Sequence, residues 1–60
     1  MKVGDLVRSN SNIAHQKFGY GFVVELGGNL TRPVTKVLWL RYKGERNPRW
    51  IHTKTLEKVE

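Results

Sequence analysis

The chain has 60 residues, no cysteine, and eleven Lys and Arg against five Asp and Glu, for a formal net charge of +6. We expect one domain, residues 1–60, without disulfides or thiolate metal sites. The positive charge attracts polyanions, so nucleic acid or an acidic protein surface is the expected class of partner. The same charge also fits solubility alone, because small domains commonly carry a net charge of roughly 2 to 8.

The N-terminal segment, Met1 to Arg8, mixes charged with apolar side chains. It lacks the apolar centre of a signal peptide and is too polar to cross a membrane. We therefore expect a soluble, cytoplasmic protein that makes no membrane contact.

The first predicted strand is Val3 to Arg8, which places Leu6 in the core. The next segment, Ser9 to Lys17, opens with Ser and Asn residues, whose short side chains bond their own backbone and favour turns. Apolar residues do not recur in it at the helical period, so we expect a loop with Ile13 tucked beneath it. No other window shows that period, and no α-helix is predicted.

The second predicted strand is Phe18 to Leu26, which is rich in aromatic and β-branched residues. Gly19 and Gly21 lie within it and indicate a bend, a bulge or a close approach of another backbone. Because side chains alternate along a strand, one face carries three aromatic rings, those of Phe18, Tyr20 and Phe22. Gly27 to Pro33 then forms a loop.

The third predicted strand, Val34 to Tyr42, is apolar on both faces. Such a strand is either buried on two sides or presents one apolar face to a partner. An uncovered stripe of Leu38, Leu40 and Tyr42 favours a homodimer. The rest of the chain is expected to form a turn (43–48), a fourth strand (49–53), one helical turn (54–56) and a last strand (57–60). The expected core contains Leu6, Val24, Val37 and Leu56.

The order of these elements resembles that of five-stranded SH3-like barrels, including Tudor, KOW-type and ribosomal-protein barrels. The resemblance rests on Gly4-Asp5-Leu6-Val7, on Gly-x-Gly-x-Val-Val at residues 19–24, and on Leu56-x-x-Val59. Val37-Leu38-Trp39 and the ending from Trp50 to Val59 look most like short SH3-like barrel proteins of tailed phages. The resemblance implies an all-β fold, a five-stranded SH3-like barrel with one short helical turn before the last strand. A phage origin implies the host cytoplasm.

Catalysis is not expected. General acid and base chemistry needs titratable groups brought together in a cleft, and the acidic residues here fall in turn or solvent-facing positions. Two isolated histidines, His15 and His52, are fewer than the three or four ligands of a zinc site. We therefore expect no enzyme activity, no metal and no cofactor, although His52 can line a binding surface.

Cations and aromatic residues are interleaved between Arg41 and Lys54, where Glu45 is the single acidic residue. Exposed rings beside cations are the combination that binds single-stranded nucleic acid. The candidate site comprises Arg41, Lys43, Arg46, Arg49, Trp50, Tyr42, Tyr20 and Arg32, with Arg32 expected at the same end of the barrel as the others. The alternative is a protein-docking module, an adaptor or accessory subunit, whose rings form a groove or cage for a peptide.

Overall fold

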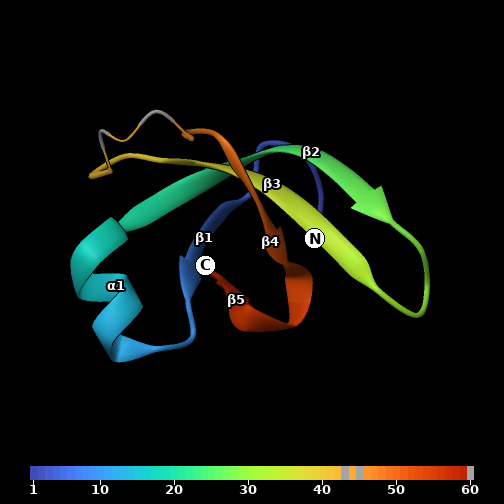
Figure 1. Ribbon diagram of the computed structural model, residues 1–60, viewed down its shortest axis with the longest axis horizontal. Coiled ribbons are helices and arrows are strands. Elements are labelled where there is room, and N and C mark those ends of the chain that lie inside the picture. Colours follow the sequence, from blue (N-terminus) through green and yellow to red (C-terminus); the bar gives the residue numbers. More distant parts are fainter. Residues whose placement is uncertain (43, 45, 60) are drawn as a thin grey trace.

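The structure is a computed structural model, and it describes residues 1–42, 44 and 46–59. The described residues form five strands, one α-helix and one 3-10 helix (Figure 1). In chain order these are β1 (Leu6–Ser9), α1 (Asn12–Phe18), β2 (Tyr20–Gly28), β3 (Pro33–Trp39), β4 (Arg49–His52), η1 (Thr53–Thr55) and β5 (Leu56–Lys58). The prediction of five strands with a helical turn before the last one is confirmed, although the turn and the last strand each begin one residue earlier than predicted, and residue 60 of the predicted last strand lies outside the described residues.

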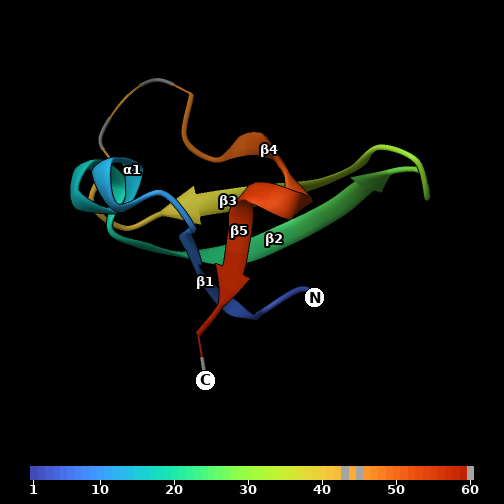
Figure 2. The same ribbon diagram turned by 90° about the horizontal axis from the view of Figure 1, so that it is seen from below.

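The strands form one antiparallel sheet in the order β4-β3-β2-β1-β5. The two edge strands, β4 and β5, are joined directly by the three residues of η1, so the sheet has to curl for its edges to meet. Figure 2 shows β1 and β5 running across β2 and β3, with η1 between β4 and β5. Strand pairing among the described residues leaves the sheet open between β4 and β5, and closure into a barrel stays a prediction.

The prediction of a loop at Ser9 to Lys17 is wrong, because α1 lies there. The side chain of Ser11 accepts a hydrogen bond from the backbone N–H of Ala14 and so caps the first turn, while Gly19 ends the helix with a φ of 70°. A helix of seven residues is too short to show a helical repeat of apolar positions. Ile13 is 83% exposed rather than tucked beneath the segment.

Five side chains form the buried core, namely Val7, Val23, Val37, Trp39 and Leu56. Val37 and Leu56 confirm the prediction. Leu6 is only half-buried, since its neighbour Val7 takes the inward position on β1. Val24 is exposed because it follows Tyr20 and Phe22 on the outer face of β2, while Gly21 and Val23 face inward opposite Trp39 and Val37.

The close approach of β2 to β3 explains why residue 21 is a glycine. A Cβ at Gly21 would lie 2.5 Å from Cγ1 of Val37 and 2.9 Å from Cε3 of Trp39, both core residues of the neighbouring strand. No larger residue fits there without moving the core. The expectation of a close approach in this part of β2 is therefore confirmed at Gly21.

The third strand ends at Trp39, three residues earlier than predicted, and Asn47 accounts for its end. The Oδ1 atom of Asn47 accepts a hydrogen bond from the Trp39 backbone N–H at 2.8 Å. Its Nδ2 donates to the carbonyls of Trp39 and Tyr42, at 2.8 and 2.9 Å. One side chain thus takes the place of a strand partner at the start of the β3–β4 connection.

Candidate functional site

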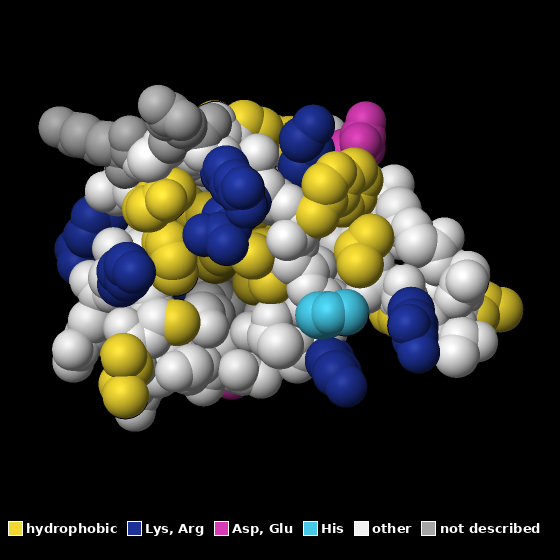
Figure 3. All heavy atoms as spheres, viewed as in Figure 1, with side chains coloured by type: hydrophobic (Ala, Val, Ile, Leu, Met, Phe, Trp, Pro, Cys, Tyr) yellow, Lys and Arg dark blue, Asp and Glu magenta, His cyan; other side chains and the backbone are white. Residues whose placement is uncertain are grey.

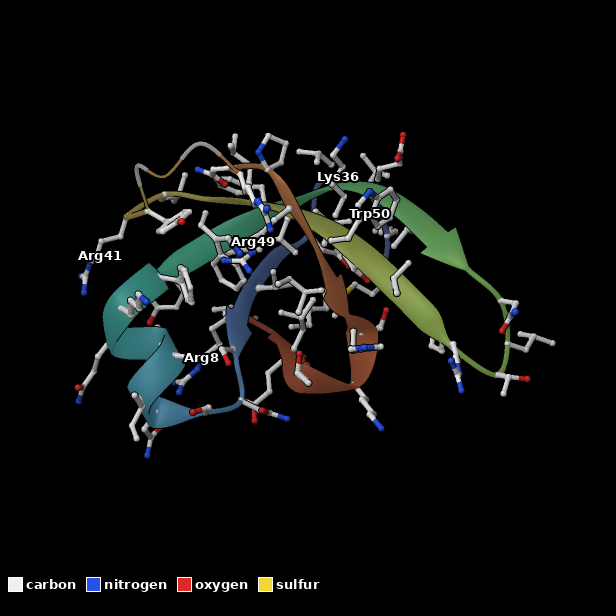
Figure 4. All side chains as sticks on the ribbon, viewed as in Figure 1. Arg8, Lys36, Arg41, Arg49 and Trp50 are labelled. Carbon is white, nitrogen blue, oxygen red and sulfur yellow. The ribbon has the colours of Figure 1, made fainter. Side chains whose placement is uncertain are left out.

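Trp50 presents an aromatic ring at the edge of the sheet. It lies on β4 opposite Lys36, and its side chain is on the outer face, the face away from the core. The ring reaches over β3 to β2, where a Cβ at Gly27 would lie 3.0 Å from two ring carbons. The residue is 46% exposed, and the Lys36 amine lies 5.7 Å from the ring centre (Figure 4). The ring is therefore supported from beneath and has a cation beside it.

Arg49 precedes Trp50 in the chain but points to the opposite face of β4, because side chains alternate along a strand. Its guanidinium lies 5.7 Å from the ring centre of Phe18 and 5.9 Å from that of Tyr42. Figure 3 shows hydrophobic side chains gathered between β4 and α1, and Figure 4 places Arg49 in that region. The two rings hold this half-buried cation beside the edge strand.

Arg41, which was predicted to join the site, lies away from Trp50 (Figure 4). Arg41 is exposed, and its Nη1 donates to the carbonyl of Gln16 at 3.1 Å, so the side chain leans on α1 (Figure 4). Arg46 is exposed in a turn. Lys43 lies outside the described residues. The structure therefore separates Arg41 from the stacking surface that it was predicted to join.

Tyr42 and Tyr20 differ in burial. Tyr42 packs against the core cluster and contacts Phe18 at a ring-centre distance of 5.1 Å. Tyr20 is exposed on the outer face of β2, and its ring centre lies 5.0 Å from that of His15, with the two rings steeply inclined to each other. Of the six aromatic residues, three contribute to the core, namely Phe18, Trp39 and Tyr42, and three are exposed, namely Tyr20, Phe22 and Trp50.

Arg32 lies in the loop between β2 and β3, at the end of the molecule opposite α1 and Arg41 (Figures 1 and 4). Its predicted place at the same end as Arg41 is wrong, because β2 and β3 are the two longest strands and carry the loop away. Arg32 instead lines a cavity of about 250 Å³ together with residues of the β4–β5 connection. The lining residues are Thr31, Arg32, Pro33, His52 and Lys54.

Three residues that lie at the site, Lys36, Lys54 and Gly27, were not among the site residues predicted from the sequence. Lys36 and Lys54 are only two of many cations in the sequence, and Gly27 is one of several turn-like glycines. Their roles depend on which residue of β3 faces Trp50 and on how far its ring reaches over the sheet. The sequence offered one usable signal, namely that His52 follows Trp50 by two residues on a short strand and so shares its face. That signal identified His52 but none of the residues contributed by other strands.

An outer apolar patch, consisting of Tyr20, Phe22, Leu38 and Leu40, covers part of β2 and β3. Phe22 lies directly opposite Leu38, and the backbone N–H of Leu40 donates to the carbonyl of Tyr20. Phe22 is 41% exposed and Leu38 38%. Tyr42, which was predicted to extend this stripe, packs against the core instead.

Comparisons with known proteins identify no relative of this chain. A scan against protein-family models, a search of curated proteins and a search of solved structures each found no match. Within residues 1–42, 44 and 46–59, no group of three or more His, Asp or Glu is placed to hold a metal ion. No helix in the same part of the chain combines the length and apolar character needed to cross a membrane.

Proposed function

We propose that this protein is a non-catalytic module that binds single-stranded nucleic acid, with Trp50 stacking on a base and neighbouring cations contacting phosphates. The observation that carries the proposal is the Trp50 ring, which is exposed, rests against Gly27 and has the Lys36 amine 5.7 Å from its centre. Stacking of a base on an aromatic side chain contributes about 1 to 3 kcal/mol. A ring that is already held in place loses little conformational freedom on binding.

Cations lie on both faces of the sheet beside the edge strand β4, Lys36 from β3 on the outer face and Arg49 from β4 on the inner face. Lys36 accompanies Trp50 on the outer face, and Arg49 lies on the other face over the rings of Phe18 and Tyr42. Figure 3 shows Lys and Arg side chains spread over this side of the molecule, with acidic side chains near its margin. A polyanion that follows β4 thus meets positive charge on either side of the strand.

We also propose that the protein is an SH3-like barrel and that it works in the cytoplasm, as predicted from the sequence. The open sheet, with its edge strands joined by η1, is compatible with an SH3-like barrel of the kind found in short proteins of tailed phages. We place such a protein in the cytoplasm, of the host if a phage encodes it. The groups of the site are a ring, an amine and a guanidinium, which suit binding, and no reaction is proposed.

Titration of a fluorescent oligothymidylate and of an oligouridylate tests the proposal by fluorescence anisotropy. Affinity should fall between about 50 and 200 mM salt, with a slope of log K against log salt of about −0.7 for each phosphate contact. Lys36→Gln and Arg49→Gln should each lower the magnitude of that slope. Lys58→Gln, an exposed cation on the opposite edge strand, is the matched control and should leave it unchanged. Absence of binding at about 50 mM salt would contradict the proposal.

The outer apolar patch favours a second candidate function, docking to a protein. Exposed hydrophobic side chains that lie side by side on a sheet mark many protein interfaces. Capture of partners by the tagged protein, with and without nuclease treatment, separates the two candidates. Partners that survive nuclease and are lost with Phe22→Ser would favour docking, whereas partners released by nuclease would favour nucleic-acid binding.

A further inference from the structure

The cavity between the β2–β3 loop and η1 is lined by side chains that suit an anion. Arg32 brings a guanidinium, Lys54 an amine, His52 an imidazole and Thr31 a hydroxyl, and none of the described acidic residues lines the cavity. Guanidinium and ammonium groups are the side chains that proteins use most to bind phosphate oxygens. The volume of about 250 Å³ leaves room for a phosphate group.

Hydrogen bonds shape the first wall of the cavity. The Oδ1 atom of Asn29 accepts hydrogen bonds from the backbone N–H groups of Thr31 and Arg32, at 2.9 and 2.8 Å. These bonds fix the loop backbone that carries Arg32. The loop therefore presents its cation from a held position rather than from a free turn.

The second wall is tied to the sheet. The hydroxyls of Thr35 and Thr53 are 2.8 Å apart, which links η1 to the buried side of β3. The hydroxyl of Thr55 donates to the carbonyl of His52 at 2.8 Å and closes the turn that carries Lys54. Because β3 also pairs with β4 at Val34 and His52, both walls of the cavity are joined to the same part of the sheet.

Within the described residues, the positive charges that line the cavity have no acidic partner within ion-pair distance. In the described part of the chain the only ion pair within 4.0 Å joins Arg8 and Glu57, which lie on β1 and β5. Like charges held together repel each other, and an anion placed between them relieves that repulsion. An anionic ligand is thus the natural occupant.

The cavity adjoins the Trp50 ring along the same strand. His52 follows Trp50 by two residues and points to the same face of β4, which places the two side chains about 7 Å apart along the strand axis. We propose that the cavity binds a backbone phosphodiester of the strand whose base stacks on Trp50. This inference rests on the proposed function and extends its site from Trp50 to the cavity lined by Arg32 and Lys54.

The test uses an oligothymidylate with hydroxyl groups at both ends, so that only diesters are present, and compares it with inorganic phosphate. Arg32→Gln and Lys54→Gln should each lower the magnitude of the salt slope by about 0.7 and weaken binding at low salt. Lys58→Gln, which removes the same charge four residues beyond Lys54, should change neither. Both cavity residues are exposed, so the variants should melt like the unmodified protein.

Amide chemical shifts locate the contact. The oligonucleotide should shift the backbone amides of Thr31, Arg32 and Lys54, together with the Trp50 indole. Shifts at Trp50 with unchanged salt slopes in Arg32→Gln and Lys54→Gln would overturn the cavity assignment and leave the proposed function standing. Shifts at the cavity with inorganic phosphate, but no binding of the oligonucleotide, would overturn the diester assignment and the proposed function together.

Discussion

Arg49 and Trp50 are consecutive in the chain, yet they present a cation and a ring on opposite faces of the edge strand β4. The guanidinium of Arg49 is 5.7 Å from the ring centre of Phe18, on the inner side. The Trp50 ring crosses the outer face toward Gly27. A ligand that contacts both residues therefore has to run along the edge of the sheet rather than lie flat on either face.

The contact between Trp50 and Gly27 gives the first prediction. Gly27→Ala places a methyl group 3.0 Å from two ring carbons, so the ring has to tilt away from β2. We expect nucleic-acid affinity to fall by about 0.5 to 1.5 kcal/mol, part of the stacking contribution, with little change in the melting temperature. Anisotropy titration measures the first and thermal unfolding the second. Unchanged affinity would mean that the position of the ring does not matter for binding.

The alternation of buried and exposed residues along β2 gives a prediction on stability. Val23 is 1% exposed and Val24 40%, so Val23→Ala should lower the free energy of unfolding by about 2 to 3 kcal/mol and Val24→Ala by less than about 1 kcal/mol. Urea denaturation of the two variants measures the difference. Equal effects, or a larger effect at Val24, would contradict the register described for β2.

The strand alternation itself was predictable, but its phase around Val23 was not. Val23 and Val24 are the same residue type side by side, and which of them enters the core depends on which face of β2 packs against the other strands. The same limit applies to Leu6 and Val7 on β1, because the packing of the neighbouring strands decides which of the two side chains is buried. Val37 and Leu56 were predicted correctly, Leu56 because it is the one large apolar residue between Ile51 and Val59, and Val37 because it shares a strand face with Trp39.

The short helix escaped prediction for a different reason. Ser11 caps it through one hydrogen bond and Gly19 ends it, and both residues are equally common in loops. Its one strong tie to the core is Phe18, which was assigned to the next strand. For the site, the residue types were predictable from charge and aromatic content. Their grouping was not, because strand register separates Arg41 from Trp50 and the long β2–β3 hairpin carries Arg32 to the cavity.

Asn47 gives a second prediction on stability. Its side chain makes three hydrogen bonds to the backbone of Trp39 and Tyr42, at 2.8 to 2.9 Å. Asn47→Ala leaves those partly buried groups without partners and should cost about 2 to 3 kcal/mol in unfolding free energy. Asn12→Ala, an exposed residue whose side chain accepts one bond from Arg8 at 3.3 Å, is the control and should cost less than about 1 kcal/mol. A small effect at Asn47 would show that the β3–β4 connection is held by other contacts.

The outer apolar patch leads to a prediction on self-association. Phe22 and Leu38 are exposed neighbours, and a second copy of the chain can cover them. Sedimentation equilibrium at concentrations on the order of tens of micromolar should show dimer, and Phe22→Ser with Leu38→Ser should reduce it. A monomer under these conditions would contradict the predicted dimer and weaken the docking alternative.

The most direct test of the account compares two exposed aromatic residues of the outer face, Trp50 and Phe22, in the same anisotropy titration with single-stranded oligonucleotide. Trp50→Ala should weaken binding roughly 5- to 150-fold, the equivalent of about 1 to 3 kcal/mol of stacking, without changing the salt slope. Phe22→Ala, which removes a ring of similar exposure from β2, should change affinity less than about twofold. Both variants should keep the melting temperature of the unmodified protein within a few degrees. Binding that is unaffected by Trp50→Ala, or equally weakened by Phe22→Ala, would contradict the assignment of Trp50 as the stacking surface.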